Sequence, residues 1–194
     1  MYHKDLACKK HSKRDSGFTL LESLITLAVF SLIAAAATSS YHNFISNKRL
    51  ENAATQIYTD LKLARSEAMK QKQNIFVSFS QKNGNWCYGL NENAPCNCMK
   101  LDDCHLKGNE KVVRGDSFQD IELQQARFAG KSTSTAFEPT RGFASGNGVK
   151  NGTIWLKANN DSQIAIIINR VGRVRFCSED LGAYAGKCPK PPKL

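Results

Sequence analysis

Two arginines near the end of the chain, Arg173 and Arg175, alternate with the apolar residues Val174 and Phe176. Successive side chains of a strand point to opposite faces, so the apolar pair would enter a core and both arginines would project on the other face. Their backbone positions would be about 6–7 Å apart, which is also the spacing of successive phosphates along a nucleic acid strand. A guanidinium group matches phosphate oxygens through parallel hydrogen bonds. The pattern therefore predicts a site for a phosphate-bearing polymer.

Other cations extend this predicted strip. Arg170 precedes the pair in a turn that contains Gly172, and Lys187 and Lys190 follow in the tail. The chain carries 27 Lys and Arg against 17 Asp and Glu, a formal net charge of +10, which favours a polyanionic partner. A strip of this size neutralises few phosphates, so we expect weak, salt-sensitive binding with a log–log salt slope of about −3 to −4. The alternative is that these are solubilising residues on an exposed face.

Residues 18–37 form a run of 20 residues in which Glu22 is the only ionisable side chain. A helix of this length is about 30 Å long, which matches the hydrocarbon core of a bilayer. The preceding residues 1–17 are basic, so they would stay in the cytoplasm while the rest of the chain is exported. The sequence predicts a membrane helix here. Glu22 is a candidate functional residue, because a carboxylate in an apolar helix needs a cationic partner.

The sequence SGFTLLE at residues 16–22 resembles the class III signal of type IV pilins and type II secretion pseudopilins. The resemblance implies that prepilin peptidase cuts between Gly17 and Phe18 and methylates the new amino group of Phe18. It also implies that Glu22 faces the N-terminal amine of a neighbouring subunit during assembly. We then expect a leader at residues 1–17, a transmembrane and assembly helix at 18–40, and a periplasmic or extracellular domain at 41–194. The expected location is the inner membrane, with a single span, and then an extracellular type IV pilus.

A helical stripe continues beyond this segment, with apolar residues spaced alternately four and three apart to about residue 72. It consists of Leu50, Ala54, Ile57, Leu61, Ala64 and Ala68. Segments of strand-like composition follow at residues 75–79, 86–90, 121–128, 153–157, 164–168 and 173–177, separated by turn-forming residues. One helix packed on an antiparallel sheet makes an α+β domain. We expect loops or irregular insertions at residues 91–120 and 129–152.

The sequences LARSEA at residues 63–68 and GRVR at residues 172–175 carry a second resemblance. The first resembles the GspH/FimT branch of minor pilins and pseudopilins. The second resembles the GRxR motif of FimT proteins, minor pilins that bind DNA during natural transformation. The resemblance implies a type IV pilin fold, DNA contacts from Arg173 and Arg175, and a turn shaped by Gly172. We add Arg170, Lys187 and Lys190 on the basis of charge and proximity.

Six of the seven cysteines would remain after Cys8 leaves with the leader. An even number in an exported domain favours disulfides, with Cys177 and Cys188 as the favoured pair because they are near in sequence and far from the rest. The pairing of the other four stays open. They are Cys87, Cys96, Cys98 and Cys104. A zinc site formed by these four with His105 is the less favoured alternative, because paired C-x-x-C spacing is missing.

Two functions follow from these patterns. The first is a minor pilin that binds extracellular DNA without sequence readout and supports DNA uptake, alongside other major and minor pilins. The second is a structural minor pilin or type II secretion pseudopilin that primes filament assembly without binding DNA. No nucleophile elbow, phosphate-cradling glycine loop or paired metal-binding histidine motif is present in the sequence, so we assign no catalytic residue and no cofactor.

Overall fold

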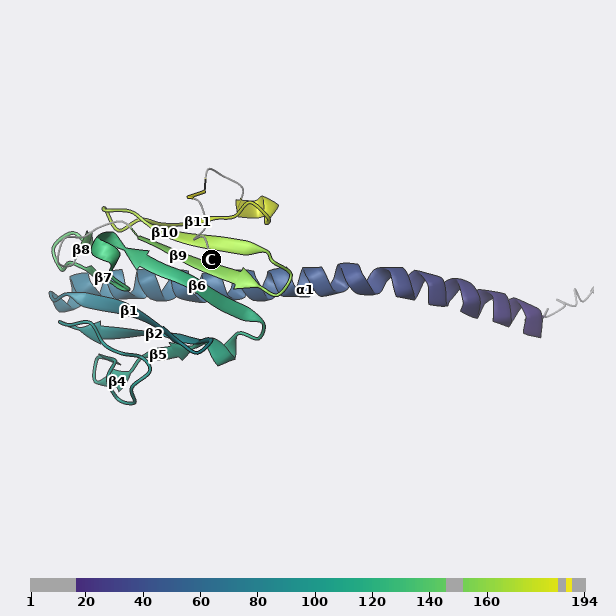
Figure 1. Cartoon of the computed structure of the whole chain (residues 1–194), viewed down its shortest axis with the longest axis horizontal. Helices are drawn as coiled ribbons and strands as arrows, with labels where there is room; N and C mark the ends of the chain where they lie inside the picture. The colour runs from purple at the N-terminus through teal and green to yellow at the C-terminus, as the bar shows by residue number, and fades with distance from the viewer. Residues whose placement is uncertain (1–16, 146–151, 185–187, 190–194) are drawn as a thin grey trace, which may run out of the picture. The chain divides into compact units, whose positions relative to one another are not determined.

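The computed structural model describes residues 17–145, 152–184 and 188–189 of the 194-residue chain (Figure 1). One long helix, α1, runs over Leu20–Gln71. The chain divides into two compact units, Met1–Tyr41 and His42–Leu194, and we describe each by itself.

The first unit contains the start of α1. Thr19 caps the helix, because its Oγ1 accepts a hydrogen bond from the main-chain N–H of Glu22 at 3.2 Å. Large apolar side chains from Phe18 to Ile33 are exposed. Within the described residues, no helix combines the length and the apolar character that crossing a membrane requires. The membrane helix at residues 18–37 stays a prediction.

In the second unit, α1 presents the predicted apolar stripe to the core. All six stripe residues are fully buried, and Ala53 is buried beside them. Two acidic residues of α1, Asp60 and Glu67, are also buried. The apolar stripe alone did not predict the burial of these two carboxylates, which lysines from a distant loop contact.

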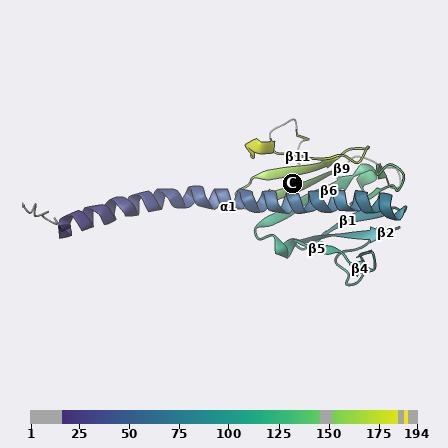
Figure 2. The same ribbon diagram turned by 180° about the vertical axis from the view of Figure 1, so that it is seen from behind.

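The strands form two main antiparallel sheets and one hairpin (Figures 1 and 2). The five-stranded sheet has the order β5-β2-β1-β7-β8, and the four-stranded sheet has the order β11-β10-β9-β6. The strands of the first are β1 Ile75–Lys82, β2 Asn85–Glu92, β5 Val112–Arg114, β7 Ser134–Phe137 and β8 Ala144–Ser145. Those of the second are β6 Ile121–Phe128, β9 Gly152–Ala158, β10 Gln163–Ile168 and β11 Val174–Cys177. The hairpin pairs β3 His105–Leu106 with β4 Asn109–Glu110, and short 3-10 helices lie at Gly115–Ser117, Ala129–Lys131 and Gly182–Tyr184.

The α+β fold class is confirmed, as is the helix packed on antiparallel strands. Each strand predicted from composition is present, although the last begins at Val174 rather than Arg173. The expectation of loops or irregular insertions at residues 91–120 and 129–152 was wrong in part, since five short strands lie in these two segments. These strands are two to four residues long, too short to show a period in sequence.

Candidate nucleic-acid interface

A tight turn positions the arginine pair. Asn169 Oδ1 accepts a hydrogen bond from the N–H of Arg173 at 2.8 Å, and the N–H of Gly172 donates to the Asn169 carbonyl at 2.9 Å. Gly172 has φ +74°, a left-handed conformation that favours glycine. The sequence Asn169-Arg170-Val171-Gly172 therefore reverses the chain between β10 and β11 and sets where β11 begins.

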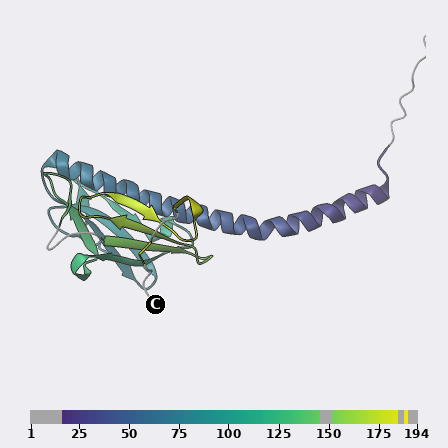
Figure 3. The ribbon, with the colours of Figure 1, turned by 90° about the horizontal axis from the view of Figure 1, so that it is seen from above.

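Strand β11 presents its side chains in the predicted alternation. Arg173 and Arg175 are exposed, while Val174 and Phe176 are half-buried and pack on the core. The Phe176 ring lies 5.0 Å from that of Tyr58 in α1, and in Figure 3 the yellow strand β11 runs close to α1. β11 is also the edge strand of its sheet. The two arginine side chains are therefore exposed to solvent and lie at the edge of the sheet.

The cations of this hairpin are not neutralised by carboxylates. Among the described residues, no ion pair involves Arg170, Arg173 or Arg175. Arg170 is exposed in the turn, and its carbonyl accepts a hydrogen bond from the N–H of Ala144 at 3.2 Å. Lys187 and Lys190, which we expected to extend the strip, lie outside the described residues.

A disulfide joins Cys177, the last residue of β11, to Cys188. It is the pair that the sequence favoured. The bond ties residue 188 to the end of the strand that carries Arg175.

The turn also borders a groove of about 420 Å³ along α1, which the sequence did not reveal. Its α1 wall is formed by Tyr58, Lys62, Arg65, Ser66 and Met69, and its other wall by Gly172, Arg173 and Val174. Lys62 Nζ lies 4.8 Å from the centre of the Tyr58 ring. The spacing of four, three and four between positions 58, 62, 65 and 69 was a detectable signal, since it places them on one helix face.

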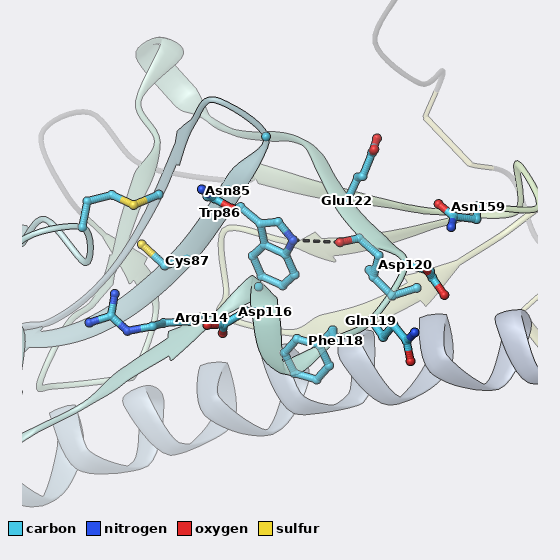
Figure 4. A pocket seen from close by; sticks show the side chains of 14 residues that line it. Asn85, Trp86, Cys87, Arg114, Asp116, Phe118, Gln119, Asp120, Glu122 and Asn159 are labelled. Carbon is cyan, nitrogen blue, oxygen red and sulfur yellow. Dashed lines mark hydrogen bonds between the residues drawn. The ribbon is translucent and has the colours of Figure 1, made fainter.

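A second cavity, of about 540 Å³, has a different character (Figure 4). Its wall includes Trp86, whose Nε1 donates to the carbonyl of Ile121 at 2.9 Å and whose ring stacks on Phe118 at 5.8 Å. The carboxylates of Asp116, Asp120 and Glu122 also line it, against a single arginine, Arg114. This acidic lining disfavours a phosphate, so the cationic groove is the better candidate for a nucleic-acid contact.

Comparison with known proteins assigns this chain to a family. Residues 53–172, more than half of the chain, match the family described as Type II transport protein GspH. The chain belongs to the GspH family. Residues 12–38 match the prokaryotic N-terminal methylation motif. This GspH-family chain is therefore a minor pilin or pseudopilin, and the motif implies processing by prepilin peptidase.

This GspH-family chain is only distantly similar to individual known proteins. It is 31% identical over 68 residues to the competence protein ComGD of Bacillus subtilis, an alignment that covers 35% of this chain and 48% of that protein. It is 22% identical over 149 residues to a fimbrial protein of Pseudomonas aeruginosa, covering 77% of this chain and 82% of the relative. A crystal structure of the minor pilin FimU from Pseudomonas aeruginosa aligns at 18% identity, with a TM-score of 0.43, over 68% of this chain and 90% of that one.

The methylation motif contains Gly17, Phe18 and Glu22. Phe18 and Glu22 are exposed at the start of α1, and a Cβ on Gly17 would meet no atom within 4 Å. The Glu22 carboxylate has no hydrogen bond or ion pair to any described residue, although the N–H of Glu22 donates to Thr19. The site of cleavage and methylation and the role of Glu22 in assembly remain predictions.

The four clustered cysteines of this GspH-family chain form two disulfides, Cys87–Cys98 and Cys96–Cys104. None of the four is left as a thiolate ligand, so the alternative of a zinc site at this cluster loses its cysteine donors. The Cys87–Cys98 bond ties residues 93–111, which we call the strap, to β2, and the Cys96–Cys104 bond closes a loop within the strap.

Two lysines of the strap reach the buried acids of α1. Lys107 Nζ lies 2.7 Å from Glu67 Oε2, and Lys111 Nζ lies 3.1 Å from Asp60 Oδ1. The hydrogen bond from Lys107, followed by that from Gln71, lowers the pKa of Glu67 below its ordinary value. These pairs explain why α1 can bury two carboxylates.

A buried hydroxyl completes the contact at Asp60. The Tyr88 hydroxyl donates to Asp60 Oδ2 at 2.7 Å. Burial and the nearby Asp60 charge raise the pKa of Tyr88 far above its ordinary value, so the hydroxyl keeps its proton and acts as a donor.

Proposed function

We propose that this chain is a minor type IV pilin that binds extracellular DNA through its C-terminal arginine strip and supports DNA uptake in natural transformation. Arg173 and Arg175 make the principal phosphate contacts, Arg170 adds a third, and Lys187 and Lys190 contribute from the tail. The observation that supports it is the pair of exposed guanidinium groups beside a tight turn, without a carboxylate partner among the described residues. The similarity to a protein named as a competence protein points the same way.

The remaining steps of the proposal concern the start of the chain. Prepilin peptidase cuts after Gly17 and methylates Phe18, and the chain is held at the inner membrane before it enters a filament with other pilins. In the filament, Glu22 pairs with the N-terminal amine of a neighbouring subunit. An acid with no described partner at the start of an apolar helix supports this role, since a cation would stabilise it.

A second candidate function is a structural minor pilin or type II secretion pseudopilin that primes the filament without binding DNA. The exposed apolar side chains from Phe18 to Ile33 favour it, because such a surface needs a covering partner. These side chains serve assembly under either function, so only a DNA-binding measurement separates the two.

The test is fluorescence anisotropy of a labelled DNA duplex with the full chain in neutral detergent. The variant Arg173→Gln with Arg175→Gln should weaken binding at least tenfold and make the log–log salt slope shallower by about 2, because two phosphate contacts are lost. The matched control is Arg114→Gln with Arg127→Gln, which removes the same charge from two other exposed arginines. If the two double variants bind DNA equally, with unchanged circular dichroism spectra, DNA binding by the arginine strip is excluded. The structural minor pilin is then the remaining candidate function.

A further inference from the structure

We propose that the groove between α1 and the β10–β11 turn is a DNA phosphate site, with Lys62 and Arg65 of α1 acting together with Arg173. This inference rests on the proposed DNA-binding function and extends it to residues outside the C-terminal motif. The helix would then provide part of the DNA-binding surface, rather than serving only as the core element behind the sheet.

Geometry brings the three cations to one hollow. Lys62 and Arg65 are one turn apart on α1, and Arg173 faces them from the other wall of the groove. Arg173 also belongs to the exposed strip with Arg175, so the groove and the strip are continuous through it. A DNA strand lying along the strip would therefore place its next phosphate at the groove.

These cations also lack the neutralising partners that other lysines have. Among the described residues, neither Lys62, Arg65 nor Arg173 forms an ion pair with a carboxylate. Six other lysines each lie within 4 Å of a carboxylate, namely Lys48, Lys70, Lys100, Lys107, Lys111 and Lys157. Three like charges lining a hollow raise the local positive potential and favour an anion there.

Arg65 has hydrogen-bonding capacity that the protein does not use. Its Nη1 donates to the Gly172 carbonyl at a long 3.5 Å, and its buried Nε has no partner among the described residues. The half-buried guanidinium therefore keeps N–H groups on its outer nitrogens that can donate to an acceptor in the groove, whereas Nε itself is enclosed. Phosphate oxygens provide acceptors in the planar arrangement that a guanidinium binds best.

Lys62 is held where a phosphate can reach it. Its Nζ lies over the Tyr58 ring, which packs on Phe176, and the side chain is exposed at the rim of the groove. A cation above an aromatic ring keeps its outward face free for a second partner. The Ser66 hydroxyl adds a neutral donor to the lining.

The test compares Lys62→Gln with Lys82→Gln in the full chain in neutral detergent, using the labelled DNA duplex. Both residues are exposed lysines without an ion pair in the described part of the chain, so each substitution removes one equivalent charge. At 0.1 M salt, Lys62→Gln should weaken binding roughly fivefold to tenfold and reduce the salt slope by about 1, while Lys82→Gln should change binding less than twofold. Lys62→Arg should restore wild-type affinity.

A second measurement avoids substitution. Acetylation of surface lysines, read by mass spectrometry, should label Lys62 more slowly in the DNA complex than in the free chain, with Lys82 labelled equally in both. If Lys62→Gln matches Lys82→Gln while the Arg173 and Arg175 double variant loses binding, the groove proposal is overturned and the proposed function stands. If the double variant binds like its control, the proposed function fails as well.

Discussion

Arg65 of α1 donates a hydrogen bond from Nη1 to the main-chain oxygen of Gly172, at 3.5 Å. These residues belong to LARSEA and GRVR, two sequences separated by more than half of the chain. In the fold they form the two walls of one groove. A Cβ added at Gly172 would lie 2.2 Å from the Gly142 carbonyl oxygen and 3.2 Å from Arg65 Nε. The turn thus packs against Gly142 only because position 172 has no side chain.

Replacing Gly172 should therefore test how closely this turn packs. Gly172→Ala introduces strain at φ +74° and also a clash with Gly142. Gly84→Ala is the matched control, since Gly84 has φ +80° with no atom within 4 Å of its added Cβ. Urea unfolding should show a loss of about 1–2 kcal/mol for Gly84→Ala. The loss for Gly172→Ala should be larger by about 1–3 kcal/mol, owing to overpacking. Equal losses would mean that the turn can move away from Gly142.

The ion pair between buried Glu67 and exposed Lys107 predicts a pH dependence of stability. Lys107 and Gln71 lower the pKa of Glu67 in the folded chain below 4.5, so its contribution is present above the unfolded pKa and is lost as pH falls through the folded pKa. Thermal unfolding should therefore show Glu67→Gln less stable than wild type near neutral pH. The two curves should converge below pH 4.5.

The control for this pH series is Glu179→Gln, which neutralises an exposed carboxylate with no hydrogen bond among the described residues. It should follow wild type at every pH. A constant difference between Glu67→Gln and wild type across the series would show that the loss comes from packing, not from the charge of Glu67.

Removing the Cys177–Cys188 disulfide should destabilise the end of the chain selectively. The cysteines are 11 residues apart, so Cys177→Ser with Cys188→Ser should lower the free energy of unfolding by about 3 kcal/mol. Hydrogen exchange should show lost protection in β10 and β11, with β1 and β2 unchanged. The reciprocal variant, Cys87→Ser with Cys98→Ser, should show the opposite pattern, because that bond ends in β2. Uniform loss across both sheets in either variant would contradict this local effect.

The start of α1 offers a test of Glu22 that separates its two structural contributions. Thr19→Val removes the oxygen that accepts the Glu22 N–H and should weaken the first helical turn by about 1 kcal/mol, seen as faster amide exchange. Glu22→Gln keeps that hydrogen bond and removes only the carboxylate charge. If the proposed assembly role holds, Glu22→Gln should sharply reduce the amount of this subunit in sheared pili, while Thr19→Val should reduce it little. Normal incorporation of Glu22→Gln would contradict the pairing with a neighbouring amine.

Much of the fold could be predicted because its longer elements have their own local patterns. The stripe from Leu50 to Ala68 has helical spacing, and β1, β9 and β10 contain runs rich in β-branched or aromatic residues. The strands β3 to β5 could not be predicted in this way. Each has two or three residues, and disulfides and lysine contacts to α1 hold the segment that contains them.

The candidate site was predictable on one wall only. Alternation along β11 placed Arg173 and Arg175 outward, which the structure shows. Lys62 and Arg65 were not predicted as site residues, because the sequence of a polar helix face does not indicate which segment packs beside it. The burial of Asp60 and Glu67 was not predicted for the same reason, since the lysines that stabilise it come from the strap.

The six paired cysteines are joined only to near neighbours, 8 to 11 positions apart. Closing so small a ring takes little chain entropy, so each link can form early, before distant parts of the chain have come together. None of these links joins one sheet to the other. The two sheets are connected by noncovalent contacts, such as the hydrogen bond from the Trp86 indole to the carbonyl of Ile121. All three disulfides can therefore form before the two sheets have packed against each other.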